Sequence, residues 1–168
     1  MELVDEIRQY AISYLDTNCP DGQVRWKNRP PRSRISIGQV AGRVDKDGYR
    51  RIVLKGRSYV ASRIVWLVHN KKFPEGVIDH INNNVSDNRI ENLRDVTVKQ
   101  NSYNRRKPST NTSGFKGVVF HKRDKKWQAC IEANGKVKFL GYFDNPTAAH
   151  QAYCRAADEI HGPYANYG

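Results

Sequence analysis

The sequence predicts an α+β protein. An N-terminal helix and a small antiparallel meander precede a strand–loop–strand–helix segment, and a three-stranded antiparallel sheet packed on one helix follows. Three patterns support this class: apolar residues at helical spacing near the N-terminus, glycine turns between short alternating runs, and an alanine-rich amphipathic run near the C-terminus. With 168 residues and 38% hydrophobic content, two small modules fit the chain better than one large core.

The first elements follow from local chemistry. Residues 2–15 carry apolar side chains near a helical period and end at "NCPDG", which predicts a helix. "GQVRWKN" predicts a short strand, and "RPPRSR" predicts a proline-interrupted connector. Two glycine turns divide alternating runs over residues 40–62, as in a β-meander. "SRIVWLVHN" predicts a short helix that ends before Pro74.

The next segment is rich in asparagine. "GVIDH" and "NLRDVT" predict two brief strands, and an asparagine-rich loop lies between them. Thr97 and Gln100 have the spacing of a capping box, which predicts a helix that continues to about residue 106. "RKPSTNTSG" has the composition of a polar linker.

The C-terminal pattern is different. "FKGVVFHKRDKKWQACIEANGKVKFLGYF" predicts three strands with two tight turns. "NPTAAHQAYCRAADEIHG" predicts a helix that Pro146 opens and Gly162 closes. We therefore expect domains at residues 1–107 and 114–168, joined by a linker at residues 108–113.

Positive charge is concentrated in one part of the chain. The net charge is +12, and residues 25–72 contain 14 Lys and Arg against two acids. Such a field predicts a polyphosphate partner. A basic surface without a partner or an anionic membrane patch is the alternative, but membrane binding favours a basic amphipathic helix and this stretch is predicted as strands and turns. The cations expected here to contact double-stranded DNA are Arg25, Lys27, Arg29, Arg32, Arg34, Arg50, Arg51 and Arg63.

Cellular location follows from what the sequence does not contain. No apolar run reaches the length of a membrane span or a secretory leader, so we expect a soluble cytoplasmic protein that does not bind membranes. The three cysteines are odd in number and far apart, which predicts neither a disulfide framework nor a zinc knuckle.

Asp79 and His80 are the candidate catalytic and metal-binding residues of the sequence. If the strand that ends there meets the start of the following helix, a carboxylate (Asp79) and an amide oxygen (Asn101) lie close to one imidazole (His80). Such oxygens suit Mg²⁺ or Mn²⁺, and a neutral imidazole accepts a proton from water near neutral pH. The alternative is an asparagine-rich turn with an exposed histidine. We expect one divalent ion and no small-molecule cofactor.

A family resemblance covers this segment. Residues 79–101 resemble the ββα-metal motif of HNH endonucleases, in the variant whose last histidine is replaced by asparagine. "GYRRIVL", "RIVW", "IDHINNNVSDNRIENLR" and "QNSYNRR" together resemble phage-type HNH homing endonucleases. The chain departs from the family at Ser62-Arg63, where relatives have His-Arg, and it lacks the cysteine pairs of the zinc-binding relatives.

The resemblance implies roles for individual residues. His80 matches the general base, and Asp79 and Asn101 match the metal ligands of a ββα-metal nuclease core. Asn92 matches the asparagine that bonds the loop backbone and orients the site, and Asn88 is expected to brace the loop. A second candidate for the last ligand is Asn104.

The C-terminal module resembles the plant Apetala/ethylene-response-factor DNA-binding domain. The shared features are "KGV", "KWQACI", "LGYF" and "AAHQAY". The resemblance implies that the outer face of the sheet contacts DNA, although Val119, His121, Cys130 and Phe139 replace the arginines and tryptophans of plant relatives. The residues expected to contact DNA from this half of the chain are Arg105, Arg106, Lys116, His121, Lys122, Arg123, Lys126 and Lys138.

The charge pattern predicts a nucleic-acid partner, and the family resemblance implies a metal-dependent, site-specific DNA endonuclease of the homing type. It would hydrolyse one phosphodiester bond by one-metal catalysis, with a histidine as general base. The chain would act as a monomer that nicks or as a homodimer. The alternatives are a DNA-binding regulator with an inactive nuclease fold and an RNA-binding protein.

Overall fold

The computed structural model describes residues 2–168. They form a mixed α/β protein with small antiparallel sheets. The chain divides into two compact units, of which the first ends at Thr97 and the second begins at Val98. No helix among the described residues is long and apolar enough to cross a membrane.

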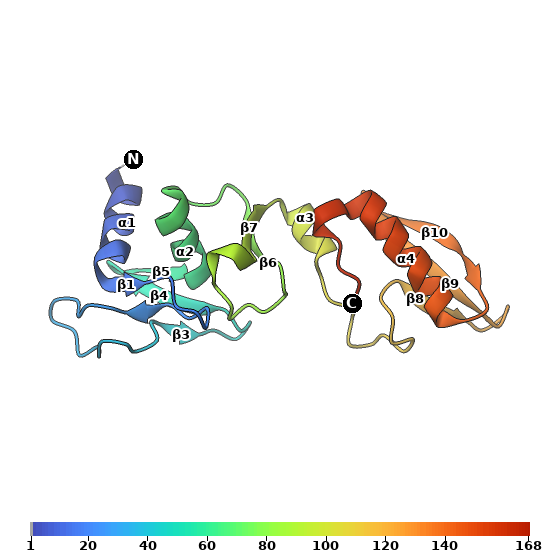
Figure 1. The fold of residues 1–168 in the computed structure, drawn as a ribbon, viewed down its shortest axis with the longest axis horizontal. Helices are drawn as coiled ribbons and strands as arrows, with labels where there is room; N and C mark the ends of the chain where they lie inside the picture. Colours follow the sequence, from blue (N-terminus) through green and yellow to red (C-terminus); the bar gives the residue numbers. More distant parts are fainter. Residues whose placement is uncertain (1) are drawn as a thin grey trace. The chain divides into compact units, whose positions relative to one another are not determined.

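Two helices lie side by side in the first unit (Figure 1). They are α1 (Glu2–Tyr14) and α2 (Ala61–Asn70). Both helices were predicted, and each buries the apolar side chains on one of its faces. The core that they share with the strands contains Ile7, Ala11, Leu15, Ile52, Leu54, Ile64 and Leu67.

The predicted meander is present. A three-stranded sheet has the order β3 (Arg43–Val44), β4 (Arg50–Leu54) and β5 (Arg57–Val60), with antiparallel neighbours. Gly48 and Gly56 occupy its turns with positive φ angles of 86° and 77°, a conformation that glycine adopts at little cost. A smaller sheet pairs β1 (Leu15–Asp16) with β2 (Arg25–Trp26).

The strands of the candidate site form a two-stranded antiparallel sheet. β6 (Val77–His80) pairs with β7 (Leu93–Val96), and a loop with a short 3₁₀ helix (Ile90–Asn92) connects them. The register places Asp79 opposite Arg94 and His80 opposite Leu93. Both strands were predicted.

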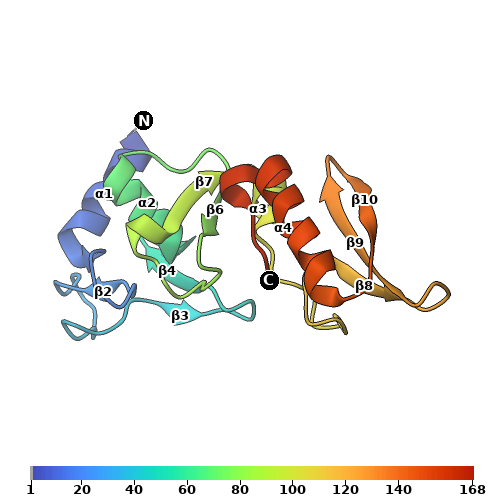
Figure 2. The same ribbon diagram turned by 45° about the vertical axis from the view of Figure 1, so that its right-hand side comes forward.

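The second unit contains the predicted three strands and helix. Its sheet has the order β10 (Lys136–Phe143), β9 (Lys126–Ala133) and β8 (Val118–His121), and α4 (Pro146–His161) covers one face (Figure 2). Asn145 caps α4 by accepting a hydrogen bond from the Ala148 amide at 2.8 Å, Pro146 stands in its first turn, and Gly162 follows its end. A short 3₁₀ helix, Gly162–Tyr164, continues from it.

Small residues bring α4 close to the sheet. Ala149 and Ala157 are fully buried; Ala149 packs in one cluster with Ala129 of β9, and Ala157 packs in another with Ile131 of β9. Ala129 and Ile131 of β9 therefore face the helix. Gly117 is as closely packed, because a Cβ atom there would lie 2.1 Å from the ring of Tyr153.

Helix α3 (Val98–Tyr103) differs from its prediction in length and in partner. It ends at Tyr103, before the predicted end near residue 106, and Lys116 Nζ donates to the Tyr103 carbonyl there. It belongs to the second unit, whereas the predicted first domain extended to residue 107. The ring of Tyr103 stacks on His161 of α4 with centroids 3.8 Å apart, which explains the assignment.

Candidate functional site

Asp79 and His80 stand together at the end of β6. Their exposed fractions are only 5% and 4%, although both side chains are polar. Burial of such groups carries a free-energy cost unless each has a partner. Their partners therefore define the site.

Arg94 is the partner of Asp79. Its Nε atom donates to Asp79 Oδ2 at 2.6 Å from the facing position on β7. The Arg94 side chain is 18% exposed and that of Asp79 is 6% exposed. The carboxylate therefore keeps a compensating positive charge within the fold.

Asn88 is the partner of His80, and it determines which ring nitrogen is basic. The Asn88 Nδ2 atom donates to the carbonyl oxygens of Gly22 and Ser86, both at 3.3 Å. Its Oδ1 atom therefore faces His80 Nε2, at 3.3 Å. An amide oxygen only accepts, so Nε2 carries the hydrogen of the neutral ring and Nδ1 carries the lone pair.

The electrostatics of His80 favour the neutral ring. Burial lowers the pKa of His80 below its ordinary value of 6.5, and this effect exceeds the opposing influence of Asn88 and of the two nearby carboxylates, Asp79 and Asp87. The imidazole is therefore in its proton-accepting form at neutral pH. The ring of Tyr49 lies near the imidazole, with centroids 6.3 Å apart.

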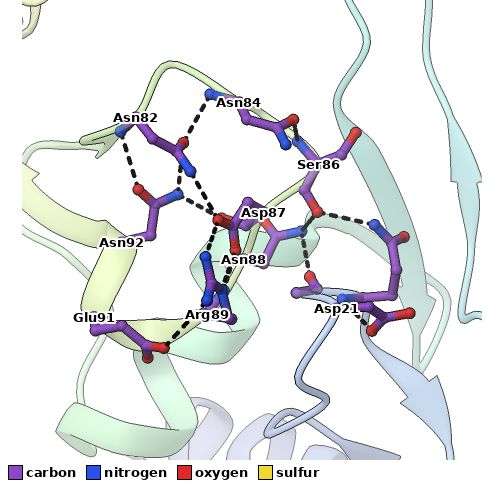
Figure 3. A network of polar contacts seen from close by, with 11 residues as sticks. Asp21, Asn82, Asn84, Ser86, Asp87, Asn88, Arg89, Glu91 and Asn92 are labelled. Atoms are coloured by element: carbon purple, nitrogen blue, oxygen red, sulfur yellow. Dashed lines mark hydrogen bonds and ion pairs between the residues drawn. The ribbon is translucent and has the colours of Figure 1, made fainter.

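Hydrogen bonds between its own residues stabilise the asparagine-rich loop (Figure 3). Asn92 Nδ2 donates to Asn82 Oδ1 at 3.0 Å and to the Asp87 carbonyl at 2.8 Å. Asn92 Oδ1 accepts from the Asn82 amide at 3.0 Å. Asn82 also donates to Asp87 Oδ2 at 2.8 Å, so one network joins both ends of the loop. The asparagines order the loop, and it is not an unstructured polar turn.

A charge pair strengthens that network. Arg89 Nε and Nη2 donate to the two carboxylate oxygens of Asp87 at 2.8 and 2.7 Å. The guanidinium lowers the pKa of Asp87 to about 2. The carboxylate is therefore charged through the physiological pH range.

The loop also rests against the turn that follows α1. The Asn88 amide donates to the Gly22 carbonyl at 3.0 Å, and Gln23 Nε2 donates to the Ser86 carbonyl at 2.9 Å. A Cβ atom at Gly22 would lie 2.6 Å from Asp87 Oδ1, and φ is +72° there. Only glycine fits such an approach.

The remaining predicted ligands lie in the second unit. Asn101 lies in α3 and is half-buried, and it stays a predicted ligand. Asn104, the second candidate, is 3% exposed, and its Oδ1 atom accepts from Asn166 Nδ2 at 3.2 Å. That bond gives Asn104 a structural role within the unit and favours Asn101 as the ligand.

Several of the cations predicted to contact DNA have intramolecular partners. In the first unit these are Asp21 for Arg25, Asp45 for Arg51, and backbone carbonyls for Arg29, Arg50 and Arg63. Arg63 also lies over the ring of Phe73, 5.8 Å from its centroid. Lys27, Arg32 and Arg34 are exposed. These three are the best placed of the predicted set to reach a phosphate.

Lys116 differs from its predicted outward position. Its Nζ atom donates to the carbonyls of Tyr103 at 3.2 Å and Arg105 at 2.5 Å. Burial lowers its pKa to about 8. Lys116 therefore holds the end of α3, as basic side chains often do. Lys126 is paired with Asp144 and Arg123 with Asp124, and the side chains of Lys122, Arg123 and Lys138 are exposed.

Sequence reasoning missed three parts of the site: Gly22, the Asp87–Arg89 pair and Arg94. Asp87 and Arg89 stand two residues apart in the loop, and that spacing was the available signal. The role of Arg94 depends on the register of two strands that a long loop separates, and no local sequence pattern predicts that register. Gly22 depends on contact with a segment far along the chain.

The donor set favours a hard divalent ion. Among residues 2–168, no group of three His, Cys, Asp or Glu side chains is arranged to hold a metal. The buried carboxylate of Asp79 suits Mg²⁺ or Mn²⁺, which bind through few protein oxygens and retain water.

Comparisons with known proteins identify related sequences. A family model described as HNH endonuclease matches residues 59–103, which include α2, β6, the loop and β7. Protein 3.8 of Escherichia phage T7 is 35% identical over 104 residues, which cover 61% of this chain and 85% of that protein. Uncharacterized HNH endonuclease L560 of Acanthamoeba polyphaga mimivirus is 28% identical over 121 residues, which cover 71% of this chain and 62% of that protein.

A plant protein also matches part of the chain. APETALA2-like protein 2 of Oryza sativa subsp. indica is 41% identical over 58 residues, which cover 34% of this chain and 13% of that protein. The chain thus spans a small part of this plant relative. No solved structure matches the chain.

Proposed function

Because the chain belongs to the HNH endonuclease family, and is therefore a nuclease, we propose that it is a metal-dependent, site-specific DNA endonuclease of the homing type. One observation carries the proposal: a buried histidine whose basic nitrogen is defined by Asn88 stands next to a buried carboxylate, Asp79. Phosphodiester hydrolysis by one metal ion requires a base for water and an oxygen ligand for the metal, side by side.

His80 acts as the general base. Its Nδ1 atom accepts a proton from the attacking water, and the lowered pKa keeps that nitrogen unprotonated at neutral pH. The bond from Nε2 to Asn88 fixes the ring orientation, and Asn92 holds the loop that carries Asn88. These two asparagines are positioning residues in this proposal.

Asp79 and Asn101 hold the divalent ion. When bound, the ion supplies positive charge to the scissile phosphate and to the leaving 3′ oxygen. Arg94 keeps the Asp79 carboxylate in place by a hydrogen bond from its Nε atom. In this proposal β6, β7 and α3 are the ββα core of the nuclease.

DNA is held mainly by phosphate contacts. Lys27, Arg32 and Arg34 of the first unit and Lys122, Arg123 and Lys138 of the second provide exposed positive charge. Each phosphate contact on duplex DNA contributes a slope of about −0.9 to the dependence of log affinity on log salt. Binding should therefore weaken steeply with salt.

The second unit adds contacts to the target. Its sheet and helix resemble a plant DNA-binding module, and its exposed cations lie on the turn between β8 and β9 and on β10. One HNH site cuts one strand. A monomer would therefore nick duplex DNA, and a double-strand break would require two copies of the chain or two successive binding events.

The test is cleavage of supercoiled plasmid by the full chain in Mg²⁺ or Mn²⁺. We expect conversion to the nicked form, no conversion in EDTA, and none with His80→Ala. Duplex binding by that variant should equal that of the parent chain. Intact plasmid with retained binding by the parent chain would instead favour a DNA-binding regulator.

A further inference from the structure

One face of the second unit is apolar and uncovered. Successive side chains on a strand point to opposite faces of the sheet. Ala129 and Ile131 of β9 pack towards α4, so the side chains between them lie on the face that points away from α4. The register places Phe139 opposite Cys130 and Tyr142 opposite Gln128, which in turn faces Val119. We call this surface the aromatic face; its residues are Val119, His121, Gln128, Cys130, Phe139 and Tyr142.

The face is accessible. Phe139 is 52% exposed, Tyr142 is 45% exposed and Val119 is 57% exposed. Large apolar groups are usually buried, and a group of them on one exposed face indicates a binding surface.

Its rings form one cluster. The centroids of Phe139 and Tyr142 are 5.1 Å apart with an interplanar angle of 62°, and those of His121 and Tyr142 are 5.2 Å apart. The cluster therefore reaches from β10 across to β8. Rings held against one another lose little side-chain entropy when a ligand binds.

The charge around the face favours a polyanion. Residues 116–144 contain seven Lys and Arg against three Asp and Glu. The exposed Lys122 and Arg123 lie on the turn beside the face, where Arg123 pairs with Asp124, and Glu132 is the acid on the same side of β9. A second copy of this unit would bring the same positive charge, so self-association through this face is disfavoured.

The chemistry of the face suits unstacked bases better than a duplex groove. Reading a groove requires free donors and acceptors. Here Gln128 Nε2 donates to Cys130 Sγ at 3.0 Å, and Val119 and Phe139 carry no polar side-chain atom. Aromatic rings beside cations instead provide the stacking platform that binds single strands. We propose that the aromatic face binds single-stranded DNA by stacking its bases on Phe139 and Tyr142.

The test compares one labelled oligonucleotide as a single strand and as a duplex, by fluorescence anisotropy with the full chain in EDTA. Phe139→Leu keeps an apolar side chain but removes the ring. We expect it to weaken single-strand binding by roughly 5- to 100-fold, the range of one lost base stack. Duplex binding should change by less than about twofold, since phosphate contacts dominate it. Phe139→Trp should retain single-strand binding.

Controls separate this proposal from others. Phe139 is exposed, so unchanged thermal unfolding of the variants is expected and would show that the fold is intact. A bromodeoxyuridine oligonucleotide should crosslink to the peptide that contains Phe139 and Tyr142. Equal loss of single-strand and duplex binding in Phe139→Leu would contradict base stacking. A change from dimer to monomer in that variant, with single-strand binding unchanged, would also contradict it. All measurements are made without metal, so they do not depend on nuclease activity.

Discussion

Arg94 Nε lies 2.6 Å from Asp79 Oδ2, and this ion pair joins β7 to β6 at directly opposed positions. Both side chains are largely buried. The fold therefore compensates the charge of the proposed metal ligand from within the same two-stranded sheet. Positive charge from Arg94 both orients the carboxylate and competes with a cation for it.

Removing Arg94 should destabilise the metal-free protein. Arg94→Ala leaves a buried carboxylate without its compensating charge, and we expect a loss of about 3 kcal/mol in the free energy of unfolding in EDTA. Divalent metal should restore more stability to this variant than to the parent chain. Urea unfolding with EDTA and with Mn²⁺ measures both effects.

Arg89→Ala is the matched control, because it removes the other arginine–carboxylate pair of this region, at Asp87. Its stability loss should be the same with and without Mn²⁺. Equal metal responses of the two variants would contradict a role for Asp79 in holding metal.

Asn88 makes two kinds of contact that can be separated. Asn88→Asp retains an oxygen acceptor for His80 but loses the donor to the Gly22 and Ser86 carbonyls. Asn88→Ala loses both, and we expect it to cost about 1–3 kcal/mol in stability. If Asn88 orients His80, Asn88→Ala should lower the cleavage rate more than Asn88→Asp. Equal rates for these variants, measured at saturating DNA, would limit Asn88 to bracing the loop.

The Asp87–Arg89 pair predicts a stability loss at acid pH. The folded pKa of Asp87 is about 2, against an ordinary value of 3.8. Between these values the unfolded state binds more protons than the folded state, so the stabilising contribution is complete above the ordinary pKa and disappears as the pH falls towards 2. Asp87→Asn should be less stable near neutral pH and should show a smaller decline across that window. Parallel curves of urea midpoint against pH for the two proteins would contradict this.

The second unit should be required for cleavage. α3 holds the proposed ligand Asn101, and its end is fixed by Lys116 and by the stack of Tyr103 on His161. A chain truncated after residue 107 loses both contacts, so we expect it to bind duplex DNA but not to nick plasmid. Cleavage by this truncated chain at the rate of the full chain would show that α3 forms its site without the second unit.

Much of the fold could be predicted from local patterns. The apolar stripes of α1, α2 and α4 and the glycine turns of the meander are each determined by residues close in sequence, and the structure has all of them. Pro146 and Gly162 marked the ends of α4 correctly. Such elements follow from local sterics and burial.

Other features depend on contacts that sequence spacing does not encode. The Asp79–Arg94 pair requires the register of two strands separated by a twelve-residue loop, 81–92. The domain boundary was predicted at residue 107, because the polar linker gave a clear compositional signal. The structure places it before α3, since Lys116 and His161 bind that helix from the C-terminal side of the chain.

The most direct test is single-turnover cleavage of a duplex that contains the mapped target, by the parent chain and by His80→Ala in Mn²⁺. Loss of a general base should lower the rate by about 100-fold or more. The dissociation constant for the duplex, measured in the same samples without metal, should stay unchanged. A variant that cleaves as fast as the parent chain would contradict the assignment of His80 as the base.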